Sequence, residues 1–169
     1  MAIFTPKKGQ DNDCVKLCEL LNYIRNPMAT NPNLVYGSYV SCRYPFDEMM
    51  IVKQCFVSPM MRTLQGRQFF HYIVSLPEEE SDNVEGFTTC MIAINQFIAN
   101  YQGAHFQTLH AIHLNTDNLH AHIILNNIDI FTGARLDLDL RGIYGLGNGV
   151  NDILQRHGFS GIYKKEMLA

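Results

Sequence analysis

The chain is organised around the stretch His110-Ala-Ile-His113-Leu-Asn-Thr-Asp117-Asn-Leu-His120-Ala-His122-Ile-Ile-Leu-Asn126. Apolar runs at 106–114 and 119–124 flank a polar tetrapeptide, which predicts two strands joined by a tight turn. Side chains alternate between faces along a strand, so His120 and His122 point the same way. With the turn at 115–118, His113 lies opposite His120, with Cβ atoms about 5 Å apart. Three imidazoles therefore converge on one sheet face, whereas His110 has the wrong parity to join them.

Such a cluster predicts a site for one divalent cation. All-imidazole ligands suit transition metals, and they also accept Mn²⁺ or Mg²⁺ when a substrate phosphate supplies hard oxygens. A cation held in this way can polarise a phosphoryl oxygen for attack by water or by a side-chain hydroxyl. The alternative is a hairpin whose histidines are structural, but the agreement of period and register favours the metal site.

Bulk composition is that of a globular protein. The 169 residues are 47% hydrophobic and 17% charged, enough for one domain with a substantial core. We expect no membrane segment, because no apolar run reaches about 18 residues, and the N-terminus lacks the order of a signal peptide. Five cysteines, an odd number without a CxxC pair, predict reduced thiols and a cytoplasmic location.

The net charge of −3 argues weakly against a nucleic-acid partner. However, five of the sixteen acidic residues lie within 78–85, and the remaining eleven against thirteen Lys and Arg leave the rest of the chain at +2. A mildly basic face is then open to residues such as Arg62, Arg67, Arg135 and Arg141. The charge does not decide the partner.

The rest of the chain alternates periodic segments with turn signals. Residues 14–25, 45–57 and 150–157 are predicted helices, and a longer helix is predicted from a capping box at Asp82 and Glu85 to Tyr101. A strand is predicted at 69–76 and a short edge strand at 135–140. Residues 4–13 are predicted to be a polar segment that leads into the first helix, and residues 28–41 a loop. The glycine-rich residues 142–149 are predicted to be flexible.

This order predicts an α+β fold. We expect an antiparallel or mixed sheet with the His-bearing hairpin at its centre and helices packed mainly on one face.

Two residues outside the hairpin are candidates for the site. Tyr23 lies about 110° from the centre of the apolar stripe of its helix, where a ring can pack while its hydroxyl faces a cleft. From position alone, an ordinary boundary tyrosine is the commoner interpretation. His71 shares a strand face with Ser75 and is predicted either to border the imidazole cluster or to serve as a structural histidine.

Several motifs resemble those of plasmid and transposon relaxases, the mobilisation nucleases of the HUH endonuclease superfamily. His113, followed by His120-Ala121-His122 and then Asn126, is similar to the family's third motif. The stretch 21–27, Leu-Asn-Tyr-Ile-Arg-Asn-Pro, resembles the first motif together with the opening residues 1–4, and 66–72 followed by Ser75 resembles the second conserved block. The resemblance covers nearly the whole chain in the right order and implies one relaxase-type nuclease domain over residues 1–169.

The resemblance implies a mechanism. Tyr23 would attack a scissile phosphodiester of single-stranded DNA at an origin of transfer, forming a 5′-phosphotyrosyl link and freeing a 3′-hydroxyl, with later rejoining by reversal. His113, His120 and His122 would hold Mg²⁺ or Mn²⁺ at the scissile phosphate. The implied partners are origin DNA and other proteins of the relaxosome, in conjugative mobilisation.

The chain also departs from the family pattern. Relatives often carry Asp two residues after the first His, where this chain has Asn115. Asp117 is a candidate to orient a ligand imidazole, as outer-shell carboxylates do, or it only shapes the turn. His71 and Asn126 are further candidates to support the ligands. Arg62 and Arg67 are candidate contacts to DNA phosphates.

Three rival functions remain open. A metal-dependent phosphoesterase would use activated water and form no covalent intermediate. A non-catalytic DNA-binding accessory protein of the same fold would bind origin DNA without metal dependence. A replication initiator of the same superfamily would share the chemistry and differ in its biological task. A covalent adduct that Tyr23→Phe abolishes separates the first two from a tyrosine-dependent strand transferase.

Overall fold

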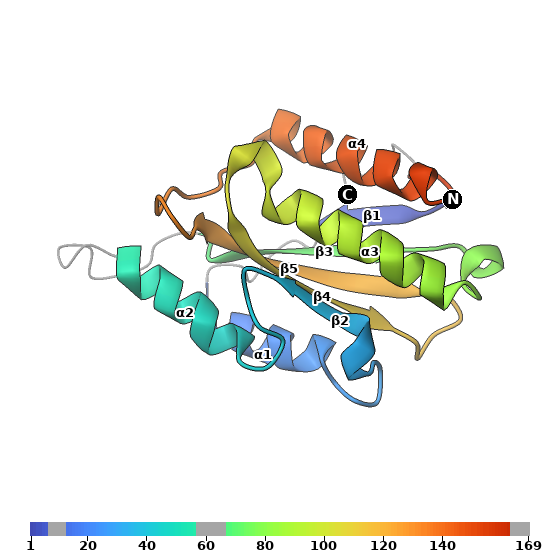
Figure 1. Cartoon of the computed structure of the whole chain (residues 1–169), viewed down its shortest axis with the longest axis horizontal. Coiled ribbons are helices and arrows are strands. Elements are labelled where there is room, and N and C mark those ends of the chain that lie inside the picture. The colour runs from blue at the N-terminus through green and yellow to red at the C-terminus, as the bar shows by residue number, and fades with distance from the viewer. Residues whose placement is uncertain (7–12, 57–66, 163–169) are drawn as a thin grey trace.

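A computed structural model of the chain describes residues 1–6, 13–56 and 67–162, so Arg62 lies outside the described residues (Figure 1). Five strands form one sheet in the order β1-β3-β5-β4-β2, and every neighbouring pair is antiparallel. The strands are β1 (Ile3–Pro6), β2 (Val35–Ser38), β3 (Phe69–Ser75), β4 (Phe106–His113) and β5 (His120–Asp129). The helices are α1 (Cys14–Ile24), α2 (Pro45–Phe56), α3 (Val84–Ala99) and α4 (Leu140–Arg156), with short 3-10 turns at Pro32–Leu34, Glu78–Glu80 and Tyr101–Gly103.

The predicted α+β class and the His-bearing hairpin are confirmed. β5 is the middle strand of the sheet and pairs with β3 on one side and with β4 on the other. His113 lies directly opposite His120 in the β4–β5 ladder, as the position of the turn predicted.

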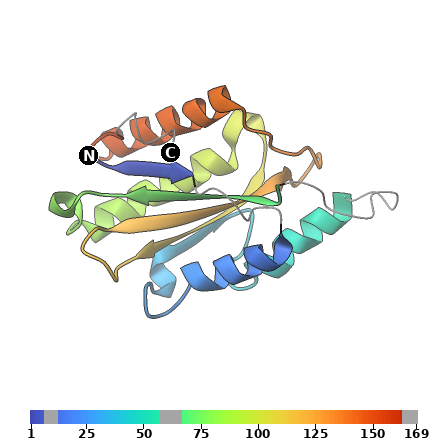
Figure 2. The same cartoon turned by 180° about the vertical axis from the view of Figure 1, so that it is seen from behind.

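The expectation that helices pack mainly on one face is wrong. α3 and α4 cover one face and α1 and α2 lie against the other (Figures 1 and 2). The reason lies in the central strands, whose inward positions are apolar on both sides: Ile112 and Ile123 pack under α3, while Leu109 and Ile124 pack under α1 and α2. A strand buried on both faces has a nearly continuous apolar run, and β5 has one from Ile123 to Leu125.

α1 follows its prediction closely. The Asp13 side chain caps it by accepting a hydrogen bond of 2.8 Å from the Val15 N–H. Leu17, Leu21 and Ile24 form its buried stripe. The helix ends just before Asn26-Pro27, because a residue that precedes proline is pushed out of the α region.

The N-cap of α3 lies one residue later than predicted. Asn83, not Asp82, is the N-cap, and its side-chain oxygen accepts a hydrogen bond of 3.0 Å from the Gly86 N–H. Its buried side chains recur at helical spacing and fill the larger core: Phe87, Cys90, Met91, Ile94 and Ile98.

β1 and β2 occupy stretches that the sequence pattern assigns to an entry segment and a loop. Both are four-residue edge strands, too short for alternation to stand out. β2 also contains Gly37, where a Cβ would lie 2.2 Å from the Val40 carbonyl oxygen. Glycine is needed there because the chain folds back over its own edge strand.

The predicted flexible segment at 142–149 is wrong, since these residues form the first half of α4. Their glycines allow the helix to approach α3 closely: a Cβ on Gly149 would lie 2.1 Å from the Phe97 ring. A Cβ on Gly145 would lie 2.6 Å from the Tyr101 hydroxyl, which donates to the Gly142 carbonyl at 3.1 Å. Packing thus overrides the low helix propensity of glycine.

The predicted edge strand at 135–140 is also not formed. The β pairing of this stretch is limited to an isolated bridge between Arg135 and Ile128, and α4 begins at its end. None of the helices within the described ranges is long and apolar enough to cross a membrane.

Candidate active site

Three imidazoles meet on the α1 side of the sheet, where β4 ends and β5 begins. His113, His120 and His122 each offer one nitrogen, and these nitrogens lie within 4.8 Å of one another. His113 and His122 are buried, while His120 is half-buried at the rim. Three converging imidazoles form a donor set suited to a divalent transition metal, so the chemistry of these residues fits the predicted metal.

Backbone carbonyls hold two of the three rings. His113 Nε2 lies 2.9 Å from the Ile24 carbonyl oxygen at the end of α1, and His120 Nδ1 lies 3.0 Å from the Asn118 carbonyl oxygen. A carbonyl can only accept, so each of these nitrogens carries the proton. The lone pair that could bind a metal is then on the other nitrogen, which fixes the tautomer of both rings.

The third ring is held by another histidine. His122 Nδ1 lies 2.9 Å from His71 Nε2, and the two rings stack with centroids 5.2 Å apart. His71 shares the face of His122 because it lies opposite Ile124 in the β3–β5 ladder. With its proton on Nδ1, His122 donates to His71 and keeps the Nε2 lone pair for an ion. The predicted place of His71 beside the cluster agrees with this geometry.

Burial favours the neutral, metal-binding form of the innermost ring. It lowers the pKa of His113 below its ordinary value, and the neighbouring His120 lowers this pKa further, against the opposing effect of the hydrogen bond to Ile24. His110 lies three residues earlier on the opposite, α3-facing side, as its parity predicted. Burial there lowers the pKa of His110 to about 3.

Tyr23 lies next to the imidazoles. Its ring packs edge-on against His113 and His122, with centroid separations of 5.8 Å and 5.6 Å. The residue is 56% exposed, so a ligand in solution can reach it. The last turn of α1 thus brings a phenol and three imidazoles into one open cluster.

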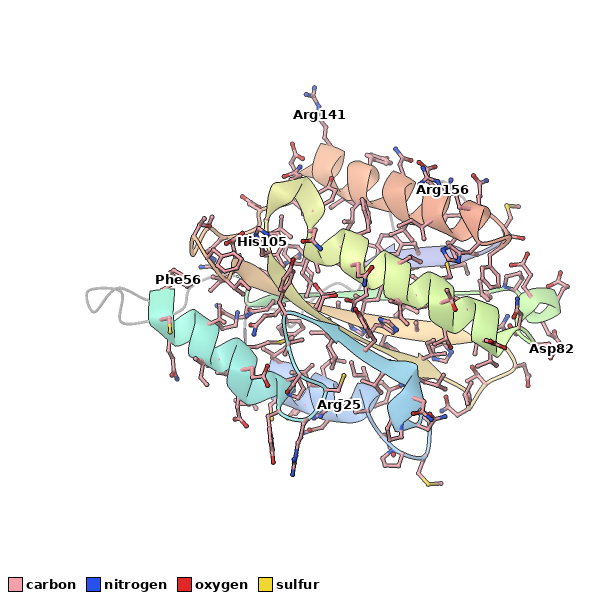
Figure 3. The ribbon with its side chains drawn as sticks, in the orientation of Figure 1. Arg25, Phe56, Asp82, His105, Arg141 and Arg156 are labelled. Carbon is pink, nitrogen blue, oxygen red and sulfur yellow. The ribbon has the colours of Figure 1, made fainter. Side chains whose placement is uncertain are left out.

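Two predicted supporting residues lie elsewhere. Asp117 is exposed in the hairpin turn and lines a hollow with Glu78, Glu79 and Asp82, at the end of the molecule marked by Asp82 in Figure 3. His120 Nδ1–H donates instead to the Asn118 carbonyl and lies 3.1 Å from Thr116 Oγ1.

Asn126 shares the sheet face of the cluster but lies four residues beyond His122. Its side-chain amide donates to the Met49 carbonyl of α2 at 3.2 Å and to Gln107 Oε1 at 2.9 Å. It therefore joins α2 to the sheet and does not orient an imidazole.

Of the predicted basic face, the three arginines that the structure describes do not surround the cluster. Arg67 precedes β3, at the opposite end of this strand from Ser75, the partner of His120, and its guanidinium packs 4.6 Å from the Phe70 ring centroid. Arg135 donates to the Arg67 carbonyl. Arg141 projects from α4, on the other side of the sheet from α1 (Figure 3).

The two carbonyls that fix the tautomers of His113 and His120 were not among the predicted site residues. Carbonyls are present at every residue, so no sequence signal marks them.

Comparisons with known proteins agree with this geometry. The family model described as "Relaxase: MobA/VirD2-like, nuclease domain" matches residues 23–159. A comparison with curated proteins finds no significant match.

Solved structures with a similar fold include the MobM relaxase domain (MOBV; Mob_Pre) bound to plasmid pMV158 oriT DNA, in Mn-bound crystal structures. One of these, with 23-nucleotide DNA, has a TM-score of 0.63 and 17% identity, over 97% of this chain and 88% of the other. Another, with 22-nucleotide DNA, has a TM-score of 0.64 and 16% identity, over 97% and 90% of the two chains. At this identity the similarity shows the fold. The family model, which spans most of the sequence, shows that this chain belongs to the MobA/VirD2-like relaxases and carries their nuclease domain.

Proposed function

We propose that this chain nicks single-stranded DNA at an origin of transfer with Tyr23 as the nucleophile, and rejoins the strand by reversal, during conjugative mobilisation. One observation carries the proposal: the exposed Tyr23 ring packs against two members of the three-imidazole cluster, His113 and His122. Membership of the relaxase family supplies the reaction class. The MobM relaxase domains of similar fold are bound to oriT DNA, which supports the same class of partner here.

His113, His120 and His122 would hold a divalent cation, Mn²⁺ or Mg²⁺. Manganese is bound in the MobM structures, and three neutral imidazoles suit it when phosphate oxygens complete the coordination. When bound, the cation supplies positive charge at the scissile phosphate. The tautomers set by Ile24 and Asn118 present the ring lone pairs for this purpose before any ion arrives.

The covalent step balances without another reactant. The Tyr23 phenol oxygen forms a bond to phosphorus, and the bond from phosphorus to the 3′-oxygen breaks. The phenol loses its proton, and the leaving 3′-oxygen gains one to become a hydroxyl. The new phosphotyrosyl diester conserves the energy of the broken one, so attack by the 3′-hydroxyl reverses the step.

Arg67 stays a predicted phosphate contact. It is exposed just before β3, at the end of this strand opposite the acidic 78–85 segment. A backbone contact of this kind positions DNA without reading its sequence. Its loss would therefore weaken binding of all single strands alike.

The test is adduct formation with a single-stranded oligonucleotide carrying the origin of transfer of the same mobile element. With Mn²⁺, we expect a protein band shifted on a denaturing gel, and we expect Tyr23→Phe to abolish it. The matched control is Tyr144→Phe, an exposed tyrosine of α4 on the other side of the sheet, which should form the adduct normally.

Two other results would overturn the assignment. Cleavage without a covalent band, unchanged in Tyr23→Phe, would identify a phosphoesterase that uses activated water. Binding without cleavage, indifferent to Mn²⁺, would identify a non-catalytic DNA-binding protein.

A further inference from the structure

One member of the imidazole cluster is less enclosed than the other two. His113 and His122 are buried, whereas His120 is half-buried and directly follows the exposed turn at 115–118 and the buried Leu119. Within the cluster the His120 ring contacts the rings of His113 and His122, with centroids 5.2 Å and 5.3 Å away. A ring packed on one side only keeps rotamer freedom, and ordering it on binding weakens the affinity for a ligand. Hydrogen bonds that hold His120 in place therefore matter more than for the two buried rings.

The turn supplies such bonds through Thr116. With its proton on Nδ1, the His120 ring faces two acceptors, the Asn118 carbonyl at 3.0 Å and Thr116 Oγ1 at 3.1 Å. The Thr116 hydroxyl donates its own proton to the same carbonyl at 2.8 Å. In this triangle each proton has an acceptor, so Thr116 holds both the ring and the carbonyl to which the ring donates.

The Asn118 carbonyl is itself fixed relative to the sheet. The Asn118 side-chain amide donates to the Leu76 carbonyl at 3.0 Å, just beyond the end of β3. The next residue, Leu119, donates from its N–H to Ser81 Oγ at 2.9 Å, and its carbonyl accepts from the Leu76 N–H at 2.9 Å. The second half of the turn is thus fastened by three bonds, and the acceptors of His120 Nδ1–H have set positions before any ion binds.

A second turn threonine shows what the turn alone requires. Thr132 lies in the turn that follows β5, and its hydroxyl accepts from the Ala134 N–H at 3.2 Å. Threonine often bonds to a nearby backbone group in this way, which shapes a turn and needs no ligand. The bond from Thr116 to the Asn118 carbonyl is of the same kind. The approach of Thr116 Oγ1 to His120 goes beyond it.

We infer that Thr116 is a positioning residue for the cation site: its hydroxyl holds the Nδ1–H of His120 and leaves the Nε2 lone pair for the ion. The sequence pattern made Asp117 a candidate for orienting an imidazole, and the neighbouring threonine takes that part. Partners that hold the far nitrogen of a ligand histidine fix its tautomer and the direction of its ring. This inference rests on the proposed function for the ion alone, because the hydrogen bonds exist without it.

The first measurement uses the metal-free protein. Imidazole ¹⁵N NMR spectra at about pH 8, where an ordinary histidine is neutral, show which ring nitrogen carries the proton. The His120 signals are identified by their loss in His120→Gln. Thr116→Val removes the hydroxyl at nearly constant shape, and Thr116→Ser keeps it. The matched control is Thr132→Val, the same change in the turn at the other end of β5.

We expect His120 to carry its proton on Nδ1 in the wild type, in Thr116→Ser and in Thr132→Val. In Thr116→Val we expect it to divide between the two neutral tautomers. Calorimetric titration of the same proteins with Mn²⁺ should show a loss of affinity of roughly tenfold in Thr116→Val, and no loss in the other two variants. Restoration by serine would assign the effect to the hydroxyl, since serine and valine both alter the side chain at this position.

An unchanged tautomer in Thr116→Val would overturn the positioning role. Equal changes in Thr116→Val and Thr116→Ser would also overturn it, because they would assign the effect to the shape of the turn. So would a changed tautomer with an unaltered affinity for Mn²⁺. A changed tautomer that serine restores, in a protein that binds no Mn²⁺ in any form, would leave the hold of Thr116 on His120 standing and overturn the proposed cation site.

Discussion

The two faces of one sheet differ in what covers them. Under α3 and α4 the central strands bury a continuous apolar core, and the glycines of α4 bring those helices close together. Under α1 and α2 the core is smaller and ends before the β4–β5 turn, where imidazoles replace aliphatic side chains. The same two strands thus supply stability on one side and an open chemical site on the other.

Strand parity decides which role a histidine takes. His110 and His113 lie on the same strand, and both have a pKa lowered first by burial. His110 is enclosed beneath α3, whereas His113 faces Tyr23 and two other imidazoles. Burial favours the neutral form of both rings, but only His113 lies under an incomplete cover and beside two further imidazoles.

The largest expected effect tests the face that α3 and α4 cover, called the closed face below. Ile94→Ala removes a fully buried side chain of α3 and should lower the free energy of unfolding by about 2–5 kcal/mol, because a cavity remains in a packed core. Urea unfolding measures it. Val15→Ala, an exposed position of α1, should cost far less. Equal losses for the two variants would contradict the division between faces.

The next effect tests the open face, the side on which α1 and α2 leave the imidazole cluster partly uncovered. His122→Ala should weaken Mn²⁺ binding by more than about 100-fold, beyond the range seen for outer-shell partners. His110→Leu should leave the affinity unchanged, since its ring lies on the other side of the sheet. Calorimetric titration with Mn²⁺ distinguishes them, and an unaltered affinity in His122→Ala would exclude the proposed ligand set.

A third prediction concerns pH and the closed face. In the fold the pKa of His110 is about 3, against 6.5 for an exposed histidine, so between these values the unfolded chain binds a proton that the folded chain does not. Stability therefore falls as the pH drops below 6.5, and His110 alone should remove about 2 kcal/mol between about pH 7 and about pH 5.

Unfolding curves at the two pH values provide the check on this prediction. His110→Leu should reduce the pH-dependent loss by that amount, because leucine does not titrate. If wild type and variant lose stability equally, His110 is accessible to protons and the closed face is less closed than described.

The smallest effect concerns the support of the open site. His71→Leu should weaken Mn²⁺ binding by about tenfold, since His122 loses the partner of its Nδ1. His71→Gln keeps an acceptor and should restore much of the affinity, which a purely structural role would not predict. Melting temperatures of both variants show whether the fold is intact, and identical affinities for the two would argue against the positioning role.

The imidazole cluster was easier to predict from the sequence than the helices and edge strands that pack around it. The parity of His113, His120 and His122 follows from a period of two and a turn position, both local, and the structure keeps that register. Tyr23 required the family resemblance, because a tyrosine at the edge of a helix stripe carries no chemical signal of its own.

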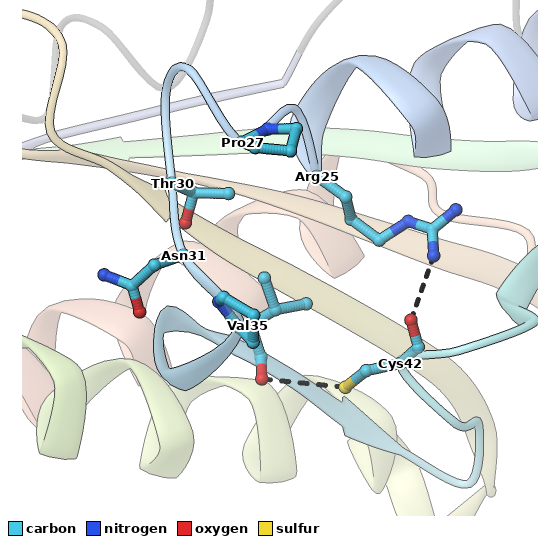
Figure 4. A pocket seen from close by; sticks show the side chains of 7 residues that line it. Arg25, Pro27, Thr30, Asn31, Val35 and Cys42 are labelled. Atoms are coloured by element: carbon cyan, nitrogen blue, oxygen red, sulfur yellow. Dashed lines mark hydrogen bonds between the residues drawn. The ribbon is translucent and has the colours of Figure 1, made fainter.

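The elements that the sequence pattern did not predict are determined by contacts between residues far apart in the chain. β2 is a strand because β4 offers it an edge. α4 is a helix that contains several glycines, and two of them are needed because Phe97 and Tyr101 leave no room for a Cβ. The end of α1 and the segment after β2 likewise meet through the bond from Arg25 to the Cys42 carbonyl, seventeen residues away (Figure 4). Local propensity cannot report such pairings.

The hydrogen bond between His113 and the Ile24 carbonyl has a consequence for how relaxases of this kind can change. It couples the rotation of α1 about its axis to the position of the imidazole cluster. Adding one residue to α1 would turn Tyr23 by about 100° and would also take the Ile24 carbonyl away from the His113 ring. The orientation of Tyr23 and the position of the His113 ring therefore cannot be changed independently. A sequence change that moves one of them must be accompanied by a change that moves the other.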